Sequence, residues 1–126
     1  MQAVLDQLRD SDRLRDLENY SVFGTTTEED YDHIVRLTAE LFDAPIALIN
    51  FVGGEEVWVK ARIGIDVQSV PCDVAFCSYT VLDDKPMIVP DLSQDARFAS
   101  NPLVAGEPGF RFYAGAPLMS AGGYGI

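Results

Sequence analysis

Residues 110–118, which read Phe-Arg-Phe-Tyr-Ala-Gly-Ala-Pro-Leu, constrain the fold more than any other stretch of the chain. They predict a β-strand, in which successive side chains point to opposite faces. One predicted face carries large rings followed by small side chains: Phe110, Phe112, Ala114, Ala116 and Leu118. The other carries Arg111, Tyr113, Gly115 and Pro117. Because small residues leave space over a sheet, we expect a hollow there that a neighbouring element or a small molecule fills.

The segments before this strand predict a helix and a hairpin. The apolar run 46–52 is typical of a strand covered on both faces, and the turn 53–55 leads into a second strand over 57–63. A helix that Thr26 or Thr27 caps and that Asp43-Ala44-Pro45 ends is expected to pack through one face. That face carries Tyr31, Ile34, Val35, Thr38, Leu41 and Phe42.

Local patterns predict shorter elements in the rest of the chain. They are a helix over 1–17 that breaks near Ser11 and Asp12, a loop over 64–73, a short helix over 75–82, a strand over 86–90, a helical turn near 96–98 within a long connection, and a hairpin that begins at 121–123.

The charge balance narrows the partners. The chain of 126 residues is long enough for one domain, and 9 Lys and Arg against 20 Asp and Glu give a formal net charge of −11. This charge repels phosphate groups, so we expect neither nucleic acid nor a membrane surface as a partner. No apolar run reaches the roughly 20 residues that a bilayer requires. Two cysteines do not make a disulfide framework, and a cytoplasmic protein is expected.

Several blocks of the sequence resemble the GAF domain found near the N-terminus of bacterial signalling proteins. The most specific are Ala75-Phe76-Cys77, Val89-Pro90-Asp91, Asp95-Ala96-Arg97-Phe98 and the run from Asn101 to Leu118. The resemblance implies an α+β fold related to PAS domains. A central antiparallel sheet then carries helices on one face and, on the other, loops and short helices that enclose a pocket. It also implies a non-enzymatic sensory domain that controls an output domain, such as a histidine kinase, a diguanylate cyclase or a phosphodiesterase.

The same resemblance sets the expected domain limits. Residues 1–20 form an N-terminal helical segment and residues 21–126 form the GAF-like domain. Members of the family continue past the position of Ile126 with a strand and a C-terminal helix, so we expect the domain to be truncated there.

A ligand site is expected where aromatic residues and a few polar groups surround the hollow, because such sites are largely apolar. The candidate ligand-binding residues are Phe76, Cys77, Arg97, Phe98, Phe112 and Ala114. Arg97 and Arg111 either meet an anionic ligand or pair with Asp91 or Asp95, and the ion pair is the favoured reading. The sequence names neither the ligand nor a cofactor, and the Asn-Lys-Phe-Asp-Glu signature of the members that bind cyclic GMP is not found.

Cys72 and Cys77 leave a different function open. A second GAF-type family reduces free methionine sulfoxide with cysteines, so the two thiols are candidates for a redox enzyme or redox sensor. The favoured alternative is that both are small buried hydrophobic residues. Covalent attachment of a chromophore is less favoured, since Ser78 follows Cys77 where bilin-binding relatives carry His. The single histidine, His33, is expected on a helix and not in a metal site.

The N-terminal helix is the predicted partner surface. Its short apolar stripe, formed by Val4, Leu5 and Leu8, is expected to support a homodimer, although it spans only about two heptads. The third alternative for the domain is a dimerisation scaffold without a ligand, in which side chains fill the hollow.

Overall fold

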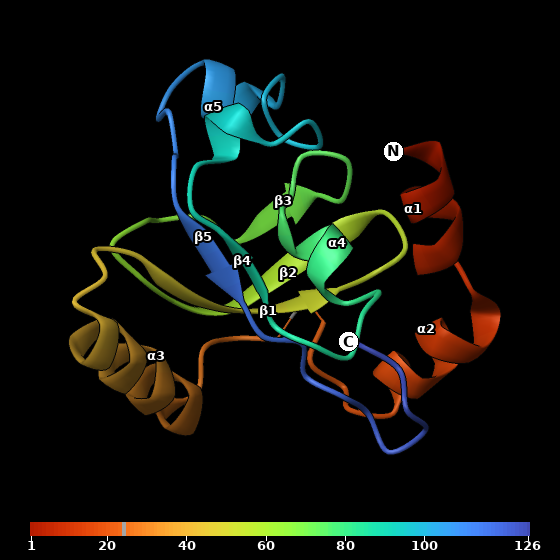
Figure 1. Cartoon of the computed structure of the whole chain (residues 1–126). Helices are drawn as coiled ribbons and strands as arrows, with labels where there is room; N and C mark the ends of the chain where they lie inside the picture. The colour runs from red at the N-terminus through yellow and green to blue at the C-terminus, as the bar shows by residue number, and fades with distance from the viewer. Residues whose placement is uncertain (24) are drawn as a thin grey trace.

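The computed structural model describes residues 1–23 and 25–126, and Figure 1 shows their arrangement. Its helices are α1 (Gln2–Leu8), α2 (Ser11–Glu18), α3 (Glu29–Phe42), α4 (Cys77–Thr80) and α5 (Pro102–Ala105), with a 3-10 turn η1 (Leu92–Gln94). Its strands are β1 (Ala47–Val52), β2 (Glu56–Ile63), β3 (Ser69–Pro71), β4 (Met87–Val89) and β5 (Tyr113–Gly115). None of the helices in these described ranges is long and apolar enough to cross a membrane.

The strands form two antiparallel sheets, one of order β1-β2-β3 and one of β4-β5. The predicted hairpin of β1 and β2 is confirmed, and the Gly53 N–H donates to the Glu56 carbonyl at 2.8 Å. Residues 64–73 were expected to be a loop, but β3 lies within them. It forms because the backbone of Ser69–Pro71 pairs with β2, a long-range partner that local sequence does not reveal.

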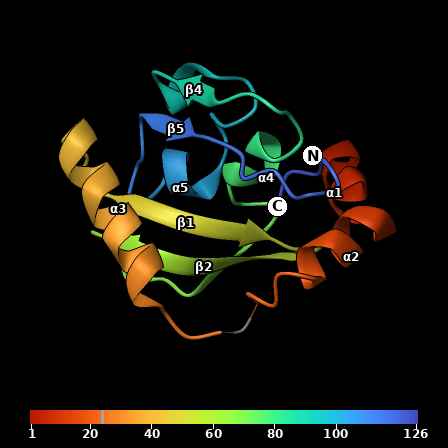
Figure 2. The ribbon, with the colours of Figure 1, turned by 90° about the horizontal axis from the view of Figure 1, so that it is seen from below.

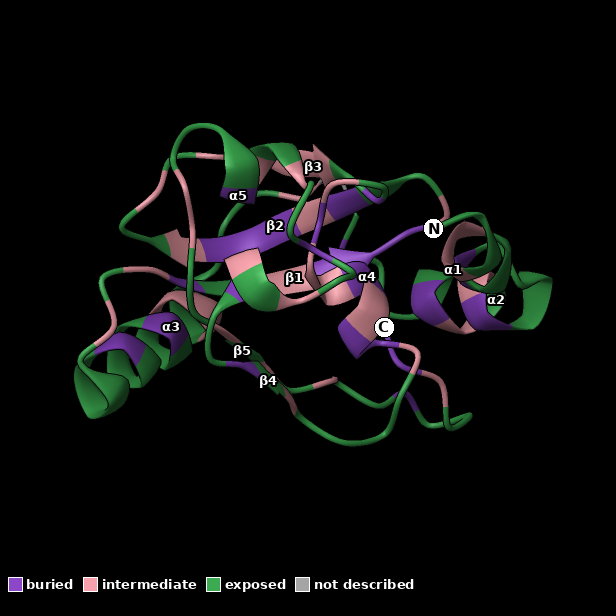
Figure 3. Cartoon of the chain, turned by 45° about the horizontal axis from the view of Figure 1, so that its top comes forward, coloured by how far each residue is buried: buried purple, intermediate pink, exposed green. Residues whose placement is uncertain are grey.

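The two faces of β1 are covered by different elements. Ala47 packs with Val35 and Ala39 of α3, whereas Val52 packs with Leu8 of α1 and with residues next to α4. α3 therefore lies on one face of the sheet, and α1 and α4 lie on the other. Figure 2 shows α3 at one end of β1 and β2, with α1 and α2 at the opposite end. β2 is buried along most of its length (Figure 3).

The expected face of α3 is only partly correct. Tyr31, Val35 and Ala39 face the sheet, whereas Ile34, Leu37, Leu41 and Phe42 are between 53% and 76% exposed. The inward stripe runs at four-residue intervals, and small side chains at Ala39, Ala47 and Ala61 let the helix approach closely. The predicted caps are also wrong. Glu28 is the N-cap and its side chain caps nothing, while Asp43 in the left-handed region ends the helix.

The strand expected over 110–118 is much shorter. β5 holds only Tyr113–Gly115, and a single bridge between Met119 and Gly125 follows. The Arg111 carbonyl accepts from Leu92 instead of from a neighbouring strand, and Pro117 has no N–H to donate to a ladder. The turn expected near 96–98 is present, since the Phe98 and Ala99 N–H groups both donate to the Asp95 carbonyl, and η1 and α5 flank it as further helical segments.

The N-terminal segment is part of the folded domain. The break predicted near Ser11 and Asp12 is present two residues earlier, at Arg9 and Asp10, and Asp10 caps α2 by accepting from the Asp12 N–H. Leu8 has no exposed surface, and Val4 and Leu5 pack against the same core cluster. The stripe expected to support a dimer is therefore used inside the domain.

Two buried cations hold distant segments together. The guanidinium of Arg13 donates to the carbonyls of Leu8, Val52 and Gly125, and so joins α1, β1 and the C-terminal residues. Burial lowers the pKa of Arg13 from its ordinary value. Lys60 lies at a β-bulge in β2, because Ile49 pairs with Ala61 and Asn50 pairs with Val59. Lys60 therefore has no partner residue on β1 in the described register, and its side chain points toward Thr25 and Thr26, in the segment before α3.

Candidate functional site: the contact between β1 and α4

An aromatic cluster fills the space between α4, β4–β5 and the connection that follows β4. Phe76, at the N-cap of α4, makes edge-on contacts with Phe98 at 5.4 Å and with Tyr113 at 5.5 Å between ring centroids. Tyr79 meets Phe98 at 5.1 Å, and Phe110 completes the group. The structure thus brings together two predicted site residues, Phe76 and Phe98, in a packed cluster.

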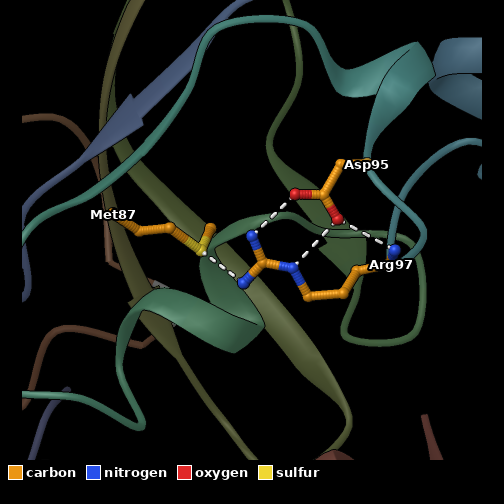
Figure 4. Close-up of polar contacts among 3 residues, drawn as sticks. All are labelled: Met87, Asp95 and Arg97. Carbon is orange, nitrogen blue, oxygen red and sulfur yellow. Dashed lines mark hydrogen bonds and ion pairs between the residues drawn. The ribbon is translucent and has the colours of Figure 1, made fainter.

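Arg97 covers the edge of this cluster. Its guanidinium forms a two-pronged pair with the Asp95 carboxylate, at 3.0 and 2.8 Å, and also donates to the Met87 sulfur (Figure 4). Its guanidinium carbon, Cζ, lies 5.0 Å from the Phe98 ring centroid and 5.7 Å from that of Tyr79. The hydrogen bonds from Arg97 lower the pKa of Asp95 and raise the pKa of Arg97. The favoured ion pair is therefore present.

Arg111 does not pair with Asp91 or Asp95. Its Nη1 donates to the carbonyls of Val104, Gly109 and Phe110, and so shapes the loop between α5 and β5.

Phe112 and Ala114 lie outside this cluster, on the outer face of β4–β5. Phe112 is 64% exposed, and Ala114 pairs with Ile88, which is equally exposed. The expected hollow over Ala114 and Ala116 is therefore wrong, because both alanines face solvent. On the inner face, the ring of Tyr113 occupies the space that a side chain at residue 115 would need. Residue 115 must therefore be glycine, because any side chain there would collide with the Tyr113 ring.

Polar side chains next to the aromatic cluster meet where α4 contacts β1. Asn50 Nδ2 donates to Cys77 Sγ at 3.6 Å, and Thr80 Oγ1 lies 2.9 Å from the Tyr113 hydroxyl. The Asn50 Oδ1 atom is buried, and no hydrogen-bond partner for it exists within residues 1–23 and 25–126. The oxygen of this buried amide therefore lacks a hydrogen bond, which costs free energy unless another group donates to it.

Neither cysteine has the surroundings of a reactive thiol. Burial raises the pKa of Cys77 to about 11 and also raises the pKa of Cys72, whose side chain is completely buried. Cys72 Sγ donates to the Gly53 carbonyl at 3.6 Å. Since the thiolate is the reactive form, these shifts oppose redox chemistry at neutral pH. His33, for its part, lies on the exposed surface of α3, 3.6 Å from Glu29.

Comparison with known proteins identifies the domain class. A profile of the GAF domain matches residues 26–126. This chain belongs to the GAF family. It is also 39% identical, over 99 residues, to a cyclic di-GMP phosphodiesterase of Pseudomonas aeruginosa, a match that covers 79% of this chain and 17% of that protein. The predicted family, its mixed helix and antiparallel-sheet fold, and its place among bacterial signalling proteins are confirmed.

Asn50 was not among the residues predicted for the site. A signal for it exists, because Asn50 is the one polar residue in the apolar run 46–52. A lone polar residue in a strand covered on both faces needs a partner, and in the structure that partner is the Cys77 thiol. Of the predicted residues, Cys77 contacts Asn50, and Phe76, Phe98 and Arg97 belong to the aromatic cluster or its edge, whereas Phe112 and Ala114 lie outside both.

Proposed function

We propose that this GAF domain is a sensory module that binds a small molecule between β1 and α4, at Asn50. Binding would shift α4 and the aromatic cluster and so control an output domain. The observation that carries the proposal is the buried Oδ1 atom of Asn50, which has no hydrogen-bond partner among the described residues. A ligand that donates a hydrogen bond to this oxygen would supply the interaction that the oxygen lacks in the free domain. The predicted ligand residues Phe76, Cys77, Arg97 and Phe98 belong to this proposal as the side chains on and around α4 that would rearrange to admit the ligand.

The proposal places catalysis outside this chain. Thiols with a raised pKa do not favour an enzymatic role, and the relative is a phosphodiesterase of which the match covers 17%. We propose that the domain regulates a cytoplasmic signalling enzyme of this kind, in which it supplies control and another domain supplies the chemistry.

Homodimerisation is a further part of the proposal. Because Val4, Leu5 and Leu8 pack within the domain, the exposed flank of α3, with Ile34, Leu37 and Leu41, offers the apolar surface for it. Sedimentation velocity of the chain and of a Leu37→Lys variant tests this. A concentration-dependent dimer that the variant abolishes supports the α3 flank, and a monomer at all concentrations contradicts the dimer.

The sensory role is tested in a chimera. The matched segment of the Pseudomonas aeruginosa phosphodiesterase is replaced by this chain, and cyclic di-GMP hydrolysis is measured in cells and with purified protein. We expect Asn50→Leu to change the hydrolysis rate in cells without loss of folded protein, because it removes the amide group that would hydrogen-bond to the ligand. Asn19→Leu, at the exposed end of α2, is the matched control. The proposal fails if Asn50→Leu leaves the rate unchanged, or if this chain alone hydrolyses cyclic di-GMP.

A further inference from the structure

Another candidate ligand site lies on the other side of the sheet from the proposed sensory site at Asn50. It is a groove of about 390 Å³ between α3 and the end of β2, lined by Thr27, Asp32, Val35, Arg36, Arg62 and Ile63. Its size falls in the range of small-molecule sites. The sheet of β1 and β2 separates it from α4 and the aromatic cluster, so a ligand here and a ligand beside Asn50 would not compete.

The charges that line this groove are unusual for the chain. The chain as a whole carries a formal charge of −11, yet two of its 9 cationic residues, Arg36 and Arg62, line the groove with only one carboxylate, that of Asp32. The groove is thus locally cationic on an acidic protein.

These cations are available to a ligand. Arg36 lies one turn after Asp32 on α3, but among residues 1–23 and 25–126 no carboxylate lies within ion-pair distance of it. Arg62 pairs at 3.4 Å with Asp66, whose side chain is 98% exposed. A surface ion pair of this kind contributes little and exchanges readily for a better-placed anion. Two guanidinium groups with few competing partners suit a carboxylate.

The remaining lining residues narrow the ligand class. Asp32 is half-buried and its carboxylate is negatively charged, so it suits a cationic group, whereas Val35 and Ile63 supply apolar surface. A ligand with only a negative charge would be repelled by the Asp32 carboxylate, and a ligand with only a positive charge would be repelled by the two guanidinium groups. We propose that this groove binds a zwitterionic α-amino acid with an apolar side chain. The carboxylate faces Arg36 and Arg62, the ammonium faces Asp32, and the side chain covers Val35 and Ile63.

Binding is tested by NMR titration of the full chain with L-leucine, following the methyl signals of Val35 and Ile63. Two probes serve as comparisons: N-acetyl-L-leucine lacks the ammonium group, and 3-methylbutylamine lacks the carboxylate. We expect saturable shifts with leucine at millimolar concentration and at least about tenfold weaker binding of either comparison probe. The proposal is overturned if leucine gives no saturable shift up to about 20 mM, or if either comparison probe binds as tightly.

Variants separate the groove from general surface charge. We expect Arg36→Gln and Asp32→Asn each to weaken leucine binding about tenfold, and Arg15→Gln on α2, also an exposed arginine, to leave it unchanged. In the described part of the chain neither Asp32 nor Arg36 forms an ion pair, so a native-like amide spectrum is expected for each variant. Equal binding by the Arg36→Gln variant and the unaltered chain contradicts the proposal. Since the proposed sensory site at Asn50 is on the opposite face of the sheet from the groove, Asn50→Leu should leave leucine binding intact.

Discussion

The ammonium group of Lys60 lies 2.7 Å from the carboxylate of Glu28, although Lys60 is 1% exposed and Glu28 is largely in solvent. Nζ also donates to Thr25 Oγ1 and to the Thr26 carbonyl, both at 2.6 Å, and lies 5.5 Å from the Tyr31 ring centroid. The β-bulge at Lys60 thus ties the segment between α2 and α3 to the centre of the sheet. A buried cation of this kind costs desolvation free energy and depends on all of its partners.

We therefore predict that removing the Glu28 carboxylate destabilises the fold more than removing the buried Lys60 charge. Glu28→Gln should lower the free energy of unfolding by about 1 kcal/mol, because Lys60 stays buried without its counter-charge. Lys60→Met, of similar volume, should stay within about 1 kcal/mol of the unaltered chain. Urea unfolding measures both, and Glu29→Gln, at an exposed position of the same helix, is the control. The opposite order would show that Lys60 contributes more by its charge than it costs.

A second prediction concerns the N-terminal helix. Leu8→Ala should lower the free energy of unfolding by about 2–5 kcal/mol, because Leu8 is completely buried with Val52, Val57 and Cys72. Leu41→Ala on α3, at a side chain 73% exposed, should change it by less than about 0.5 kcal/mol. Similar losses for the two variants would contradict the packing of α1 on the domain.

The raised pKa of Cys77 predicts both slow alkylation and a pH-dependent stability. In the folded chain its pKa is about 11 against an ordinary 9.0, so at pH 8 the thiolate is scarce and iodoacetamide should react far more slowly than in guanidinium chloride. Between these values the unfolded chain releases the proton while the folded chain keeps it. The folded state therefore binds more protons, and its stability falls as pH rises from about 9 to 11.

Cys77→Ser is the control for this pH dependence. The variant should lose part of the decline in stability above pH 9, since Ser does not titrate there. Denaturant midpoints measured from pH 7 to pH 10.5 give the result. Rapid alkylation of Cys77 in the folded chain at neutral pH would instead favour the redox alternative.

A fourth prediction concerns the pair of Asp95 and Arg97. Hydrogen bonds from Arg97 lower the pKa of Asp95 below its ordinary 3.8, so the pair stabilises the fold above that value and this stability is lost as the pH falls through the lowered pKa. Arg97→Gln should raise the pKa of Asp95 toward its ordinary value, as followed by NMR of the carboxyl carbon. Arg15→Gln, which lacks contact with Asp95, should leave it unchanged. An unaltered Asp95 titration in the Arg97→Gln variant would contradict the ion pair.

Local signals were sufficient for some elements of this GAF domain. The apolar run and the Gly53-Gly54 turn predicted the β1–β2 hairpin, because a tight turn and strand periodicity involve residues close in sequence. The aromatic residues around Phe76 and Phe98 predicted an apolar cluster at this place. The blocks from Ala75 to Leu118 indicated the family, which the GAF profile match confirmed.

The sequence by itself determined the family, the α+β class, the main hairpin and the presence of α3, since each follows from spacing along the chain. The tertiary structure decided which face of α3 packs, how short β5 is, that Ala114 faces solvent, and that Asn50 meets Cys77 with half of its amide unpaired. The tertiary structure also decided that Lys60 is buried, because Lys60 lies at a β-bulge that the sequence of residues 57–63 does not predict. The physical reason is that burial and hydrogen bonding depend on segments far apart in the chain, and their free energies outweigh local preference.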